Sequence, residues 1–572
     1  MAIIRHIDIK NFRSIKEISW FPKNGLNCLI GPGDSGKSTI LDAIDLTLGA
    51  RRSFSFNDAD FYKLNTNNPI VIQITLGELD DNLKNIEIYG NFLRGFDKTN
   101  KRINDEPLQG DEIVLTLQLT IREDLEPDWL LYSNRAHNEG IEKRLQWKHR
   151  EQLTPARLGT TAYQHLAFGN RSILNKLSED TFDQSLTLAK LGRQTRQDFN
   201  QRSESVTGLT QLLIQTKQIA NRLGVPVGEL KALLDVNGIS LSNGAISLHN
   251  DDDTPLRQLG TGSSRLLISG LHKAANKSKI IIIDEVEYGL EPYRITRLLN
   301  ELGSKENSPS KQVFITTHSP YVLKELQAQQ LHVLRTEPPS HNIYYLEDDN
   351  DTQQSTLRAC AEAFFSKAVI VGEGKTEIGL VRGLESLNQN GENKGIQSQG
   401  VFCTDGGGDS LFQRAEVFAS LGYPTALLKD SDLTHKGHNK QSRNCRDTGV
   451  TIFEWGNELS TEGALLTCCP LHTIPTIISL AIRFNGEHKV KQDIQKHSGN
   501  TYRYEDYTNS PEEAMRIPLA SAVGKGKWFK NISKAEALTI EIIASNYQDI
   551  TGNFKTTIDS LLEWVNRSGD RR

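Results

Sequence analysis

The sequence predicts an α/β protein built from two successive modules, and three observations lead to this fold class. Short apolar runs typical of buried strands alternate with helix-length segments along the 572 residues. A glycine-rich loop of the G-x-x-x-x-G-K-[ST] type stands early in the chain, at 31–38. From residue 367 onward, four apolar runs each lead directly into an acidic residue. The first module is therefore expected to hold a phosphate group, and the second a cation.

Length and composition limit the class of protein. The chain is longer than one hydrophobic core usually supports, so about two to four domains are expected. Lys and Arg total 66 against 71 Asp and Glu, a net charge of −5, which argues against a uniformly basic nucleic-acid binder but leaves local basic patches open. The six cysteines form no C-x-x-C pair, which favours reduced thiols over a zinc site. With no apolar run near ~18 residues and no signal-peptide core after Met1, we expect a cytoplasmic protein without membrane contact.

A strand, a glycine loop and a helix open the first module. Residues 3–9 alternate like a half-buried strand, 27–30 form an apolar run into the loop, and 40–48 show helical periodicity. In this context the backbone N–H groups of the loop and the helix N-terminus face a phosphate. Lys37 is expected to reach the β- and γ-phosphates of ATP, and Ser38 to ligate Mg²⁺. The residues expected to bind the nucleotide in this loop are Gly31, Gly33, Asp34, Ser35, Gly36, Lys37, Ser38 and Thr39.

Three later motifs agree with a nucleotide site. The apolar strand 279–283 ends in Asp284 and Glu285, which are expected to hold the Mg²⁺ shell and to polarise the attacking water. The strand-like run 312–317 ends in His318, which could sense the γ-phosphate. The segment 259–265, which contains Ser263, could present backbone amides and hydroxyls to the nucleotide at a helix start.

These four motifs, in this order and after the opening Ile7–Ile15, resemble the ABC-type ATPase head of the SMC/RecF/OLD group. In that group the loop at 259–265 completes the nucleotide site of a second subunit. The resemblance therefore implies a homo-oligomer, a dimer or a tetramer, in which Ser263 and Arg265 act in trans. The loop is not a full L-S-G-G-Q, Asp34 replaces a more usual asparagine, and no Q-loop glutamine is evident, so the rate of ATP hydrolysis stays open.

A polar, helical segment at 151–235 interrupts this head, which is expected to occupy 1–150 and 236–345. Apolar residues between Leu209 and Ile219 recur at helical spacing, but no long heptad run exists, which excludes a long coiled coil. Two interpretations remain, a dimerisation arm, as the resemblance implies, or an ordinary packed helical subdomain.

The second module, at 355–572, is expected to be a small parallel α/β sheet. Its strand ends carry acids, and parallel sheets gather such residues at their carboxyl edge. Glu373 follows the first strand, and Asp430 and Asp432 follow the third, where alternation places both on one side of an extended segment. Carboxylates are the ligands that Mg²⁺ or Mn²⁺ prefers, and two such ions can clamp both oxygens of a phosphodiester displacement.

This arrangement of a glutamate and a D-x-D pair resembles the Toprim domain. An ABC head followed by Toprim looks like the OLD-family nucleases, which include the nuclease subunit of Gabija-type anti-phage systems. The resemblance implies that Glu373, Glu377, Asp430 and Asp432 ligate metal, joined by Glu458 or, preferably, Glu462. It also implies a late catalytic lysine that stabilises charge on phosphorus. The candidates for it are Lys525, Lys527, Lys530 and Lys534, of which Lys530 and Lys534 are favoured.

Two basic segments could meet nucleic acid or could be merely solvated. One is 434–443, which reads as a flexible loop directly after the D-x-D pair. The other is a cluster at 143–150 that contains Lys143, Arg144, Lys148, His149 and Arg150.

The sequence thus predicts an ATP-regulated, Mg²⁺- or Mn²⁺-dependent endonuclease acting on DNA in prokaryotic defence, in a homo-oligomer and with a helicase-like protein as a further partner. Two alternatives remain, a RecF-like repair ATPase whose second domain does not cut, and a Toprim effector that cleaves RNA.

Overall fold

The computed structural model divides the chain into two compact units. Unit 1 comprises nearly all of the chain up to Ile343, and unit 2 nearly all of it from Tyr344 onward. The described residues are 2–51, 53–158, 166, 174, 207–234, 246–274, 278–337, 340–347, 350–389, 395–431, 436–456 and 458–569. Within these ranges, no helix is both long and apolar enough to cross a membrane.

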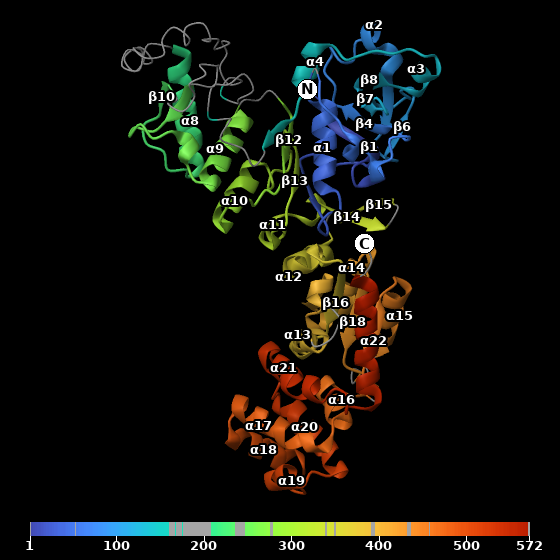
Figure 1. Ribbon diagram of the computed structural model, residues 1–572, viewed down its shortest axis with the longest axis vertical. Helices are drawn as coiled ribbons and strands as arrows, with labels where there is room; N and C mark the ends of the chain where they lie inside the picture. Colours follow the sequence, from blue (N-terminus) through green and yellow to red (C-terminus); the bar gives the residue numbers. More distant parts are fainter. Residues whose placement is uncertain are drawn as a thin grey trace. The chain divides into compact units, whose positions relative to one another are not determined.

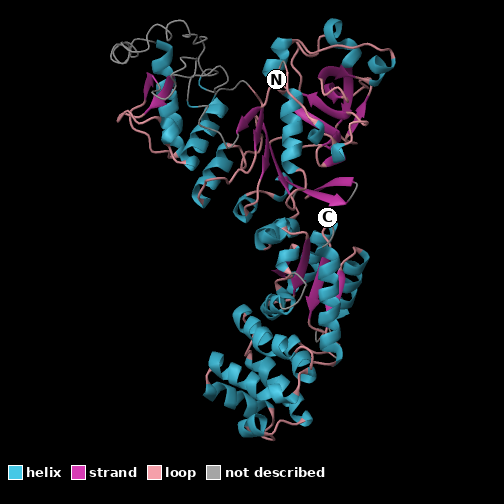
Figure 2. Cartoon of the chain, viewed as in Figure 1, coloured by secondary structure: helices cyan, strands magenta, loops and turns pink. Residues whose placement is uncertain are grey.

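Unit 1 contains an antiparallel sheet of seven strands in the order β2-β1-β4-β7-β5-β6, with β8 also paired to β7. Figure 2 shows the strands of the chain in magenta. The predicted opening strand is confirmed, because β1 runs from Ile3 to Phe12 and turns into its antiparallel neighbour β2. These strands are β1 (Ile3–Phe12), β2 (Ile15–Trp20), β4 (Ile70–Gly77), β5 (Leu93–Asp97), β6 (Arg102–Asn104), β7 (Glu112–Ile121) and β8 (Pro127–Tyr132).

The second sheet of unit 1 has the order β15-β14-β3-β13-β12-β9. Its central strands β3, β13 and β12 pair in parallel and are buried along their whole length, which explains their continuous apolar sequences. The strands are β3 (Leu26–Ile30), β9 (Ala156–Leu158), β12 (Ile280–Ile283), β13 (Gln312–Thr316), β14 (Leu331–Glu337) and β15 (Ser340–Tyr345), and a separate hairpin joins β10 (Lys231–Leu234) to β11 (Ile246–His249). The helices of unit 1 are α1 (Lys37–Leu48), α2 (Ile86–Tyr89), α3 (Asn134–Asn138), α4 (Trp147–Leu153), α8 (Thr207–Leu223), α9 (Thr261–Ala274), α10 (Pro292–Glu301) and α11 (Pro320–Glu325).

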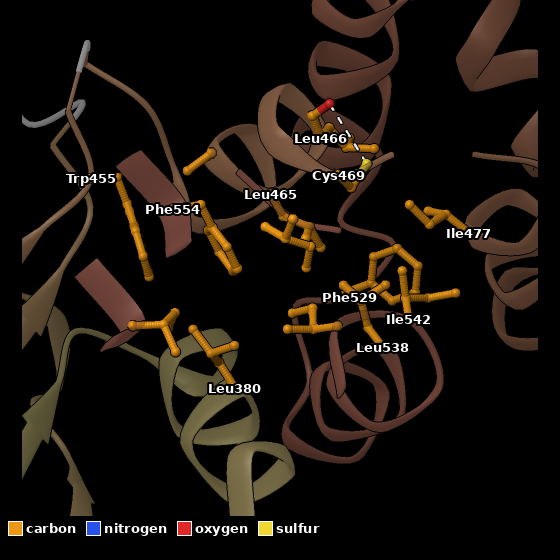
Figure 3. Close-up of a cluster of buried hydrophobic side chains, with 14 of the residues drawn as sticks. Leu380, Trp455, Leu465, Leu466, Cys469, Ile477, Phe529, Leu538, Ile542 and Phe554 are labelled. Atoms are coloured by element: carbon orange, nitrogen blue, oxygen red, sulfur yellow. Dashed lines mark hydrogen bonds between the residues drawn. The ribbon is translucent and has the colours of Figure 1, made fainter. Parts of the chain in front are cut away.

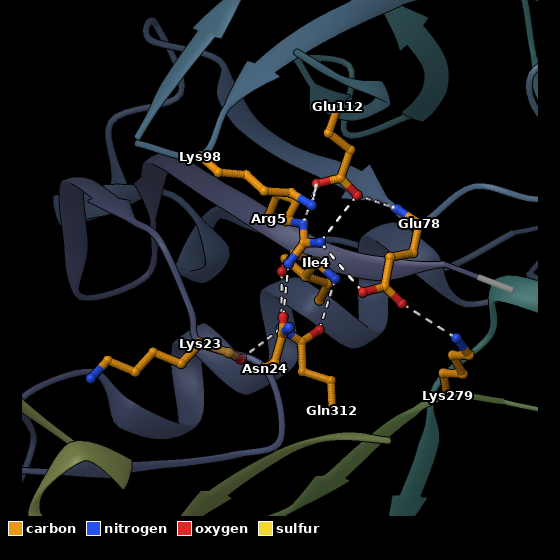
Figure 4. A network of polar contacts seen from close by, with 9 residues as sticks. All are labelled: Ile4, Arg5, Lys23, Asn24, Glu78, Lys98, Glu112, Lys279 and Gln312. Atoms are coloured by element: carbon orange, nitrogen blue, oxygen red, sulfur yellow. Dashed lines mark hydrogen bonds and ion pairs between the residues drawn. The ribbon is translucent and has the colours of Figure 1, made fainter. Parts of the chain in front are cut away.

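The two large sheets are joined by a polar network (Figure 4). Gln312, the first residue of β13, accepts a hydrogen bond from Ile4 N at 2.7 Å and donates to Ile4 O at 2.9 Å. Arg5 of the same strand β1 forms two hydrogen bonds with Glu112, at 2.9 and 3.1 Å, and one with Asn24 at 2.7 Å. The first strand of the chain is thereby fixed to the sheet that carries the glycine loop.

The predicted insert at 151–235 is only partly separate from the head. Its residues 156–158 form β9, which pairs in parallel with β12 and so belongs to the head's own sheet. The predicted helix is present as α8, and it packs on α9 where Gly270 leaves room, since a Cβ there would lie 2.3 Å from the Ile219 side chain. Most of 159–206 lies outside the described residues, so the dimerisation arm stays a hypothesis.

Unit 2 contains a four-stranded parallel sheet in the order β17-β16-β18-β19, as the sequence predicts. From β16 the chain passes to β17 on one side and then to β18 on the other, so the topological switch point, where such sheets place their sites, lies between the carboxyl ends of β16 and β18. The elements are β16 (Ala368–Gly372), β17 (Val401–Asp405), β18 (Thr425–Lys429) and β19 (Thr451–Glu454), with α12 (Asp351–Ala359), α13 (Lys375–Gln389), α14 (Leu411–Ser420) and α15 (Lys436–Asp447).

A long helical stretch follows β19 before the last helix returns to the sheet. Figure 1 shows α22 lying alongside this sheet, which it contacts at β16, β17 and β19. The stretch shares one continuous core with the sheet, in which Trp455, Phe529 and Phe554 are fully buried (Figure 3). Its helices are α16 (Thr461–Cys468), α17 (Ile474–Asn485), α18 (Glu487–His497), α19 (Tyr504–Asn509), α20 (Arg516–Gly526), α21 (Ile532–Leu538) and α22 (Gly552–Gly569).

Two glycines fix this stretch to the sheet's first helix. Gly379 and Gly383 lie one turn apart on α13, where α21 packs. A Cβ at Gly379 would lie 2.5 Å from Ala535 Cβ, and a Cβ at Gly383 would lie 2.3 Å from Thr539 Cβ. The segment just before α21 is thereby held close to α13.

Candidate nucleotide and carboxylate sites

The glycine loop leads into a helix whose N-terminus is not capped by a side chain. α1 begins at Lys37 after Gly36, which has a left-handed backbone (φ 94°) and no side chain to cap the helix. Lys37 is only 5% exposed, and its ammonium donates to Ser35 Oγ at 3.3 Å. Burial lowers the pKa of Lys37, against the opposing charges of Asp284, Asp34 and Glu285. A phosphate beside it would replace lost solvation with a charge-assisted hydrogen bond.

The two residues predicted to share a magnesium ion touch each other. Ser38 Oγ donates to Asp284 Oδ1 at 3.2 Å, and Thr316 Oγ1, at the end of β13, donates to the same oxygen. Thr316 Oγ1 also accepts from Glu285 N at 2.8 Å. Sequence reasoning assigned no role to Thr316, which holds Asp284 and Glu285 at the end of β12.

Glu285 and His318 both lie at this edge. Glu285 is exposed and adopts a left-handed backbone (φ 48°), which turns it away from the line of β12. His318 is exposed, and its backbone N–H donates to Glu287 Oε1 at 2.6 Å. Thr317 Oγ1 donates to the other oxygen of Glu287 at 2.6 Å. Glu287, which sequence reasoning missed, thereby anchors the turn that presents His318.

Ser263 and Arg265, which are predicted to act on a nucleotide held by a second subunit, are both buried in their own chain. Ser263 is 6% exposed and accepts from Arg294 at 2.9 Å. Arg265 is 4% exposed and donates to the carbonyl oxygens of Asp284 at 3.1 Å and Tyr288 at 3.4 Å. Both side chains therefore have partners within their own chain. The preceding Gly260 is exposed and has open space around it.

In unit 2 the predicted acids converge at the carboxyl edge of the sheet. Glu373 Oε2 accepts from the backbone N–H of Asp430 at 2.9 Å, which joins the ends of β16 and β18. Glu377, in the first turn of α13, accepts from Gly374 N at 2.8 Å and from Thr461 Oγ1 at 2.7 Å. Asp430 Oδ1 also lies 2.9 Å from Thr461 Oγ1. Asp432 lies outside the described residues.

Two further residues reach this edge from the helical stretch. Glu462, in the first turn of α16, is 1% exposed, and neither of its carboxylate oxygens has a hydrogen-bond partner. Lys530, two residues before α21, places its ammonium 3.6 Å from Glu462 Oε2. These two are among the sequence candidates, and the structure brings both to Asp430 and Glu377.

A buried carboxylate without a hydrogen-bond partner is costly unless a cation lies beside it. The Glu462 oxygens, which accept no hydrogen bond and have the Lys530 ammonium 3.6 Å away, join the oxygens of Glu373, Glu377 and Asp430 as the hard ligands that Mg²⁺ or Mn²⁺ takes. The residues present therefore fit a divalent metal. Among the described residues, no group of three or more Asp, Glu, His or Cys side chains is arranged closely enough to hold a metal ion without some movement.

Burial and mutual repulsion shift the pKa values of the acids in this cluster. Burial, and then the charge of Glu377, raise the pKa of Asp430 to about 7. Burial likewise raises the pKa of Glu377. Burial alone would lower the pKa of Lys530, but the nearby carboxylates, Glu462 and Asp430 foremost, raise it. A divalent cation here would relieve repulsion among the acids.

The remaining sequence candidates in unit 2 lie elsewhere. Lys534 donates to Asn485 Oδ1 at 3.0 Å at the end of α17, so Lys530 and not Lys534 faces the acids. Glu458 is exposed, whereas Glu462 is buried in the site. Glu454, at the end of β19, forms an ion pair with Lys429 at 2.7 Å. Lys525 and Lys527 are exposed on and after α20.

The two basic segments also differ from their predictions. The predicted flexible loop is a helix, α15, from Lys436 onward, with Lys440 and Arg443 exposed. The cluster at 143–150 is not one surface, because His149 and Arg150 are buried, the first bonded to Tyr89 at 2.8 Å and the second to Gly49 O at 3.0 Å.

Comparison with known proteins agrees with this division of the chain. Residues 26–324 match the family model described as "AAA domain, putative AbiEii toxin, Type IV TA system", and 364–432 match "Overcoming lysogenization defect protein-like, TOPRIM domain". The OLD nuclease of Thermus scotoductus is 25% identical over 436 residues, which cover 68% of this chain and 74% of that protein. RecF of Nitrosococcus oceani is 50% identical over 54 residues, which cover 9% of this chain and only 15% of RecF.

Solved structures give weaker likenesses. The Smc head of Pyrococcus furiosus covers 61% of this chain and 97% of its own, at 15% identity and a TM-score of 0.40. The SMC head of Thermotoga maritima covers 60% and 99%, at 15% identity and a TM-score of 0.31. With TM-scores this low, the fold assignment rests on the two family models and the sheets described above. Since the first model spans just over half of the chain, the protein belongs to this AAA-domain ATPase family, and it joins to that domain an OLD-like TOPRIM domain.

Proposed function

We propose that the protein is an ATP-regulated, divalent-metal-dependent endonuclease that cleaves DNA. One observation carries the proposal, the meeting of Glu373, Glu377, Asp430, Glu462 and Lys530 at the carboxyl edge of the TOPRIM sheet. The buried carboxylate of Glu462, which accepts no hydrogen bond and faces Lys530 at 3.6 Å, supports a cation site at this edge. The likeness to an OLD nuclease over 68% of the chain supports nuclease chemistry.

In this proposal each residue has one role. A bound Mg²⁺ or Mn²⁺ would supply charge neutralisation and an activated water. Glu373, Glu377, Asp430 and Glu462 would hold it, together with Asp432. Lys530 would place its ammonium against the scissile phosphate, where it stabilises the charge that grows on the non-bridging oxygens.

The head would supply the control by ATP. Lys37 and the first turn of α1 would hold the phosphates, with Ser38 and Asp284 on the same magnesium ion. Glu285, turned out of the strand, would orient the attacking water, and His318 would lie by the γ-phosphate. Lys37→Ala should therefore lose nucleotide, whereas Glu285→Gln should keep ATP and slow its hydrolysis.

The test is cleavage of supercoiled plasmid and of a structured RNA, each with Mg²⁺ or Mn²⁺, with and without ATP. We expect nicked and linear DNA that EDTA prevents, and no cleavage by Glu373→Gln. Different responses of Lys37→Ala and Glu285→Gln to ATP would establish regulation. ATP-dependent DNA binding without cleavage would instead indicate a RecF-like repair ATPase. Cleavage of the RNA but not of the plasmid would show that RNA, and not DNA, is the substrate.

We further propose a role in anti-phage defence, which rests on the resemblance to Gabija-type nucleases. Cells that express the wild-type protein should lower the plating efficiency of some phages, and Glu373→Gln should abolish this protection. Equal plating with both proteins across a broad phage panel would contradict this role and leave the nuclease proposal standing.

A further inference from the structure

Thr461 occupies the centre of the carboxylate cluster and is itself neither an acid nor a base. Its hydroxyl oxygen lies 2.7 Å from Glu377 Oε1 and 2.9 Å from Asp430 Oδ1. Its backbone N–H donates to the same Asp430 oxygen at 2.7 Å. The residue is 5% exposed, so water does not compete freely for these contacts.

The indole of Trp455 determines how this hydroxyl can act. Trp455 Nε1 donates to Thr461 Oγ1 at 2.7 Å, and an indole N–H can only donate. It therefore takes one lone pair of the hydroxyl oxygen, whose single hydrogen points to one of the two carboxylates. Trp455 is fully buried and stacks on Phe554 of α22 with ring centres 5.0 Å apart, so its N–H is fixed in direction.

These contacts connect four separate elements at one atom. Glu377 lies on α13, Asp430 follows β18, Trp455 follows β19, and Thr461 opens α16. Glu462 is the next residue of the same helical turn, so a shift of Thr461 would move Glu462 as well. The spacing of Glu377, Asp430 and Glu462 therefore depends on Thr461.

We propose that Thr461 is a positioning residue, held by Trp455, which sets the spacing of Glu377, Asp430 and Glu462 for a divalent cation. The inference rests on the proposed function, because it assigns the cluster to metal. Hydrogen-bonding residues behind metal ligands typically contribute about 10–100-fold to metal affinity. Thr461 supplies such a contact to two ligands at once.

The test measures Mn²⁺ binding to the full-length protein by electron paramagnetic resonance, without nucleotide or nucleic acid. Asp430→Asn removes one of the metal ligands, so the Mn²⁺ binding that this variant retains is the background from sites outside the cluster. Thr461→Val keeps the side-chain shape and removes the hydroxyl, Thr461→Ser keeps the hydroxyl, and Trp455→Phe keeps the stacking ring and removes the N–H. Thr467→Val, on the same helix, is the matched control, since Thr467 is exposed and bonds only to Gly463 O among the contacts of the described chain.

We expect the Mn²⁺ dissociation constant of Thr461→Val to rise about 10–100-fold. Thr461→Ser should restore most of the affinity, Trp455→Phe should fall between, and Thr467→Val should match the wild type. The Mn²⁺ concentration that gives half-maximal cleavage should rise in the same order.

Wild-type Mn²⁺ affinity in Thr461→Val and Trp455→Phe, with both proteins folded, would overturn the inference. If Thr461→Val does not fold, an unchanged affinity in Trp455→Phe overturns it and a weakened one supports it. Failure of the proposed function is distinct, because a wild-type protein that binds Mn²⁺ at this cluster and cuts no nucleic acid would contradict only the nuclease.

Discussion

The two sites of this chain differ in where their side chains come from. In the nucleotide site, Asp284 and Thr316 stand at or just after the end of a strand of one sheet, and Lys37 follows β3 of the same sheet after the glycine loop 31–36. Strand and functional residue are neighbours in sequence, so local sequence alone brings each to the edge. The site needs only correct strand pairing to form.

The carboxylate site is assembled differently. Glu373 and Asp430 follow strands, but Glu462 and Lys530 come from the helical stretch and reach the edge only because that stretch packs back on α13. Carboxylates lie near the lysine of each site, but burial lowers the pKa of Lys37, whereas the carboxylates raise the pKa of Lys530. Local motifs thus identify the first site, and tertiary packing completes the second.

The largest expected effect separates the two lysines that the sequence could not distinguish. Lys530→Met should lower the maximal cleavage rate by roughly 10²–10³-fold, because it removes a charge beside the scissile phosphate. Lys534→Met should leave that rate close to wild type, since Lys534 bonds to Asn485 instead. Single-turnover cleavage at saturating Mg²⁺ measures both rates, and equal losses would refute the assignment.

The next test disrupts the packing between α13 and α21 that completes the carboxylate site. Gly383→Val should force α21 away from α13, since even a Cβ would lie 2.3 Å from Thr539 Cβ. Cleavage should fall by about 10–100-fold as Lys530 moves from the acids, and nucleotide binding should persist.

Gly524→Ala on α20 is the matched control. A Cβ there meets nothing within 4 Å, so this change should keep activity and stabilise the helix by about 0.5–1 kcal/mol. Wild-type activity in Gly383→Val, with unchanged thermal stability, would show that the packing does not matter.

A third test asks how unit 1 responds to acid. His332 is fully buried beneath Trp20, and burial lowers its pKa to about 3. In the unfolded chain the imidazole takes up a proton below its usual pKa near 6.5, whereas in the folded chain it stays neutral. The free energy of unfolding therefore falls as the pH falls. At pH 5 this loss amounts to about 2 kcal/mol relative to pH 7.5.

Urea unfolding of unit 1 at the two pH values, in the wild type and in His332→Gln, isolates the contribution of His332. The wild type should lose more stability than the variant between the two conditions. An equal loss in both proteins would mean that the buried imidazole is protonated without cost.

The smallest effect tests whether a second chain completes the nucleotide site. Gly260→Arg should block that contact without disturbing the fold, since Gly260 is exposed and its surroundings are open, unlike the buried Ser263. Lys37→Ala and Gly260→Arg should each lose ATPase activity. Mixed in equal amounts, they should recover about a quarter of the wild-type rate, because half of the dimers are mixed and each has one intact site. No recovery after co-expression, or full activity in a strict monomer, would contradict a composite site.

The sequence predicted the two parallel sheets because their strands are continuous apolar runs, whereas it predicted only the opening strand of the antiparallel sheet. Apolar strands followed by Lys37, Asp284, Glu373 or Asp430 gave the parallel sheets and two site edges. The roles of Thr461 and Trp455 could not be predicted, because a threonine and a tryptophan carry no metal signature and act only through contacts with residues far along the chain. The choice between Lys530 and Lys534 likewise could not be made from the sequence, because it depends on how the start of α21 is oriented relative to the acids.

The interruption between β19 and α22 also has a consequence for biosynthesis. Asp430 leaves the ribosome 100 residues before Lys530, an interval of roughly 5–20 s at ordinary rates of translation, and Glu373 leaves it earlier still. The sheet's last helix, α22, ends at Gly569 and emerges later still. A nascent chain therefore carries the acids before the lysine, so under the proposed function it should not cleave nucleic acid until Lys530 has emerged and the helical stretch has packed against the sheet.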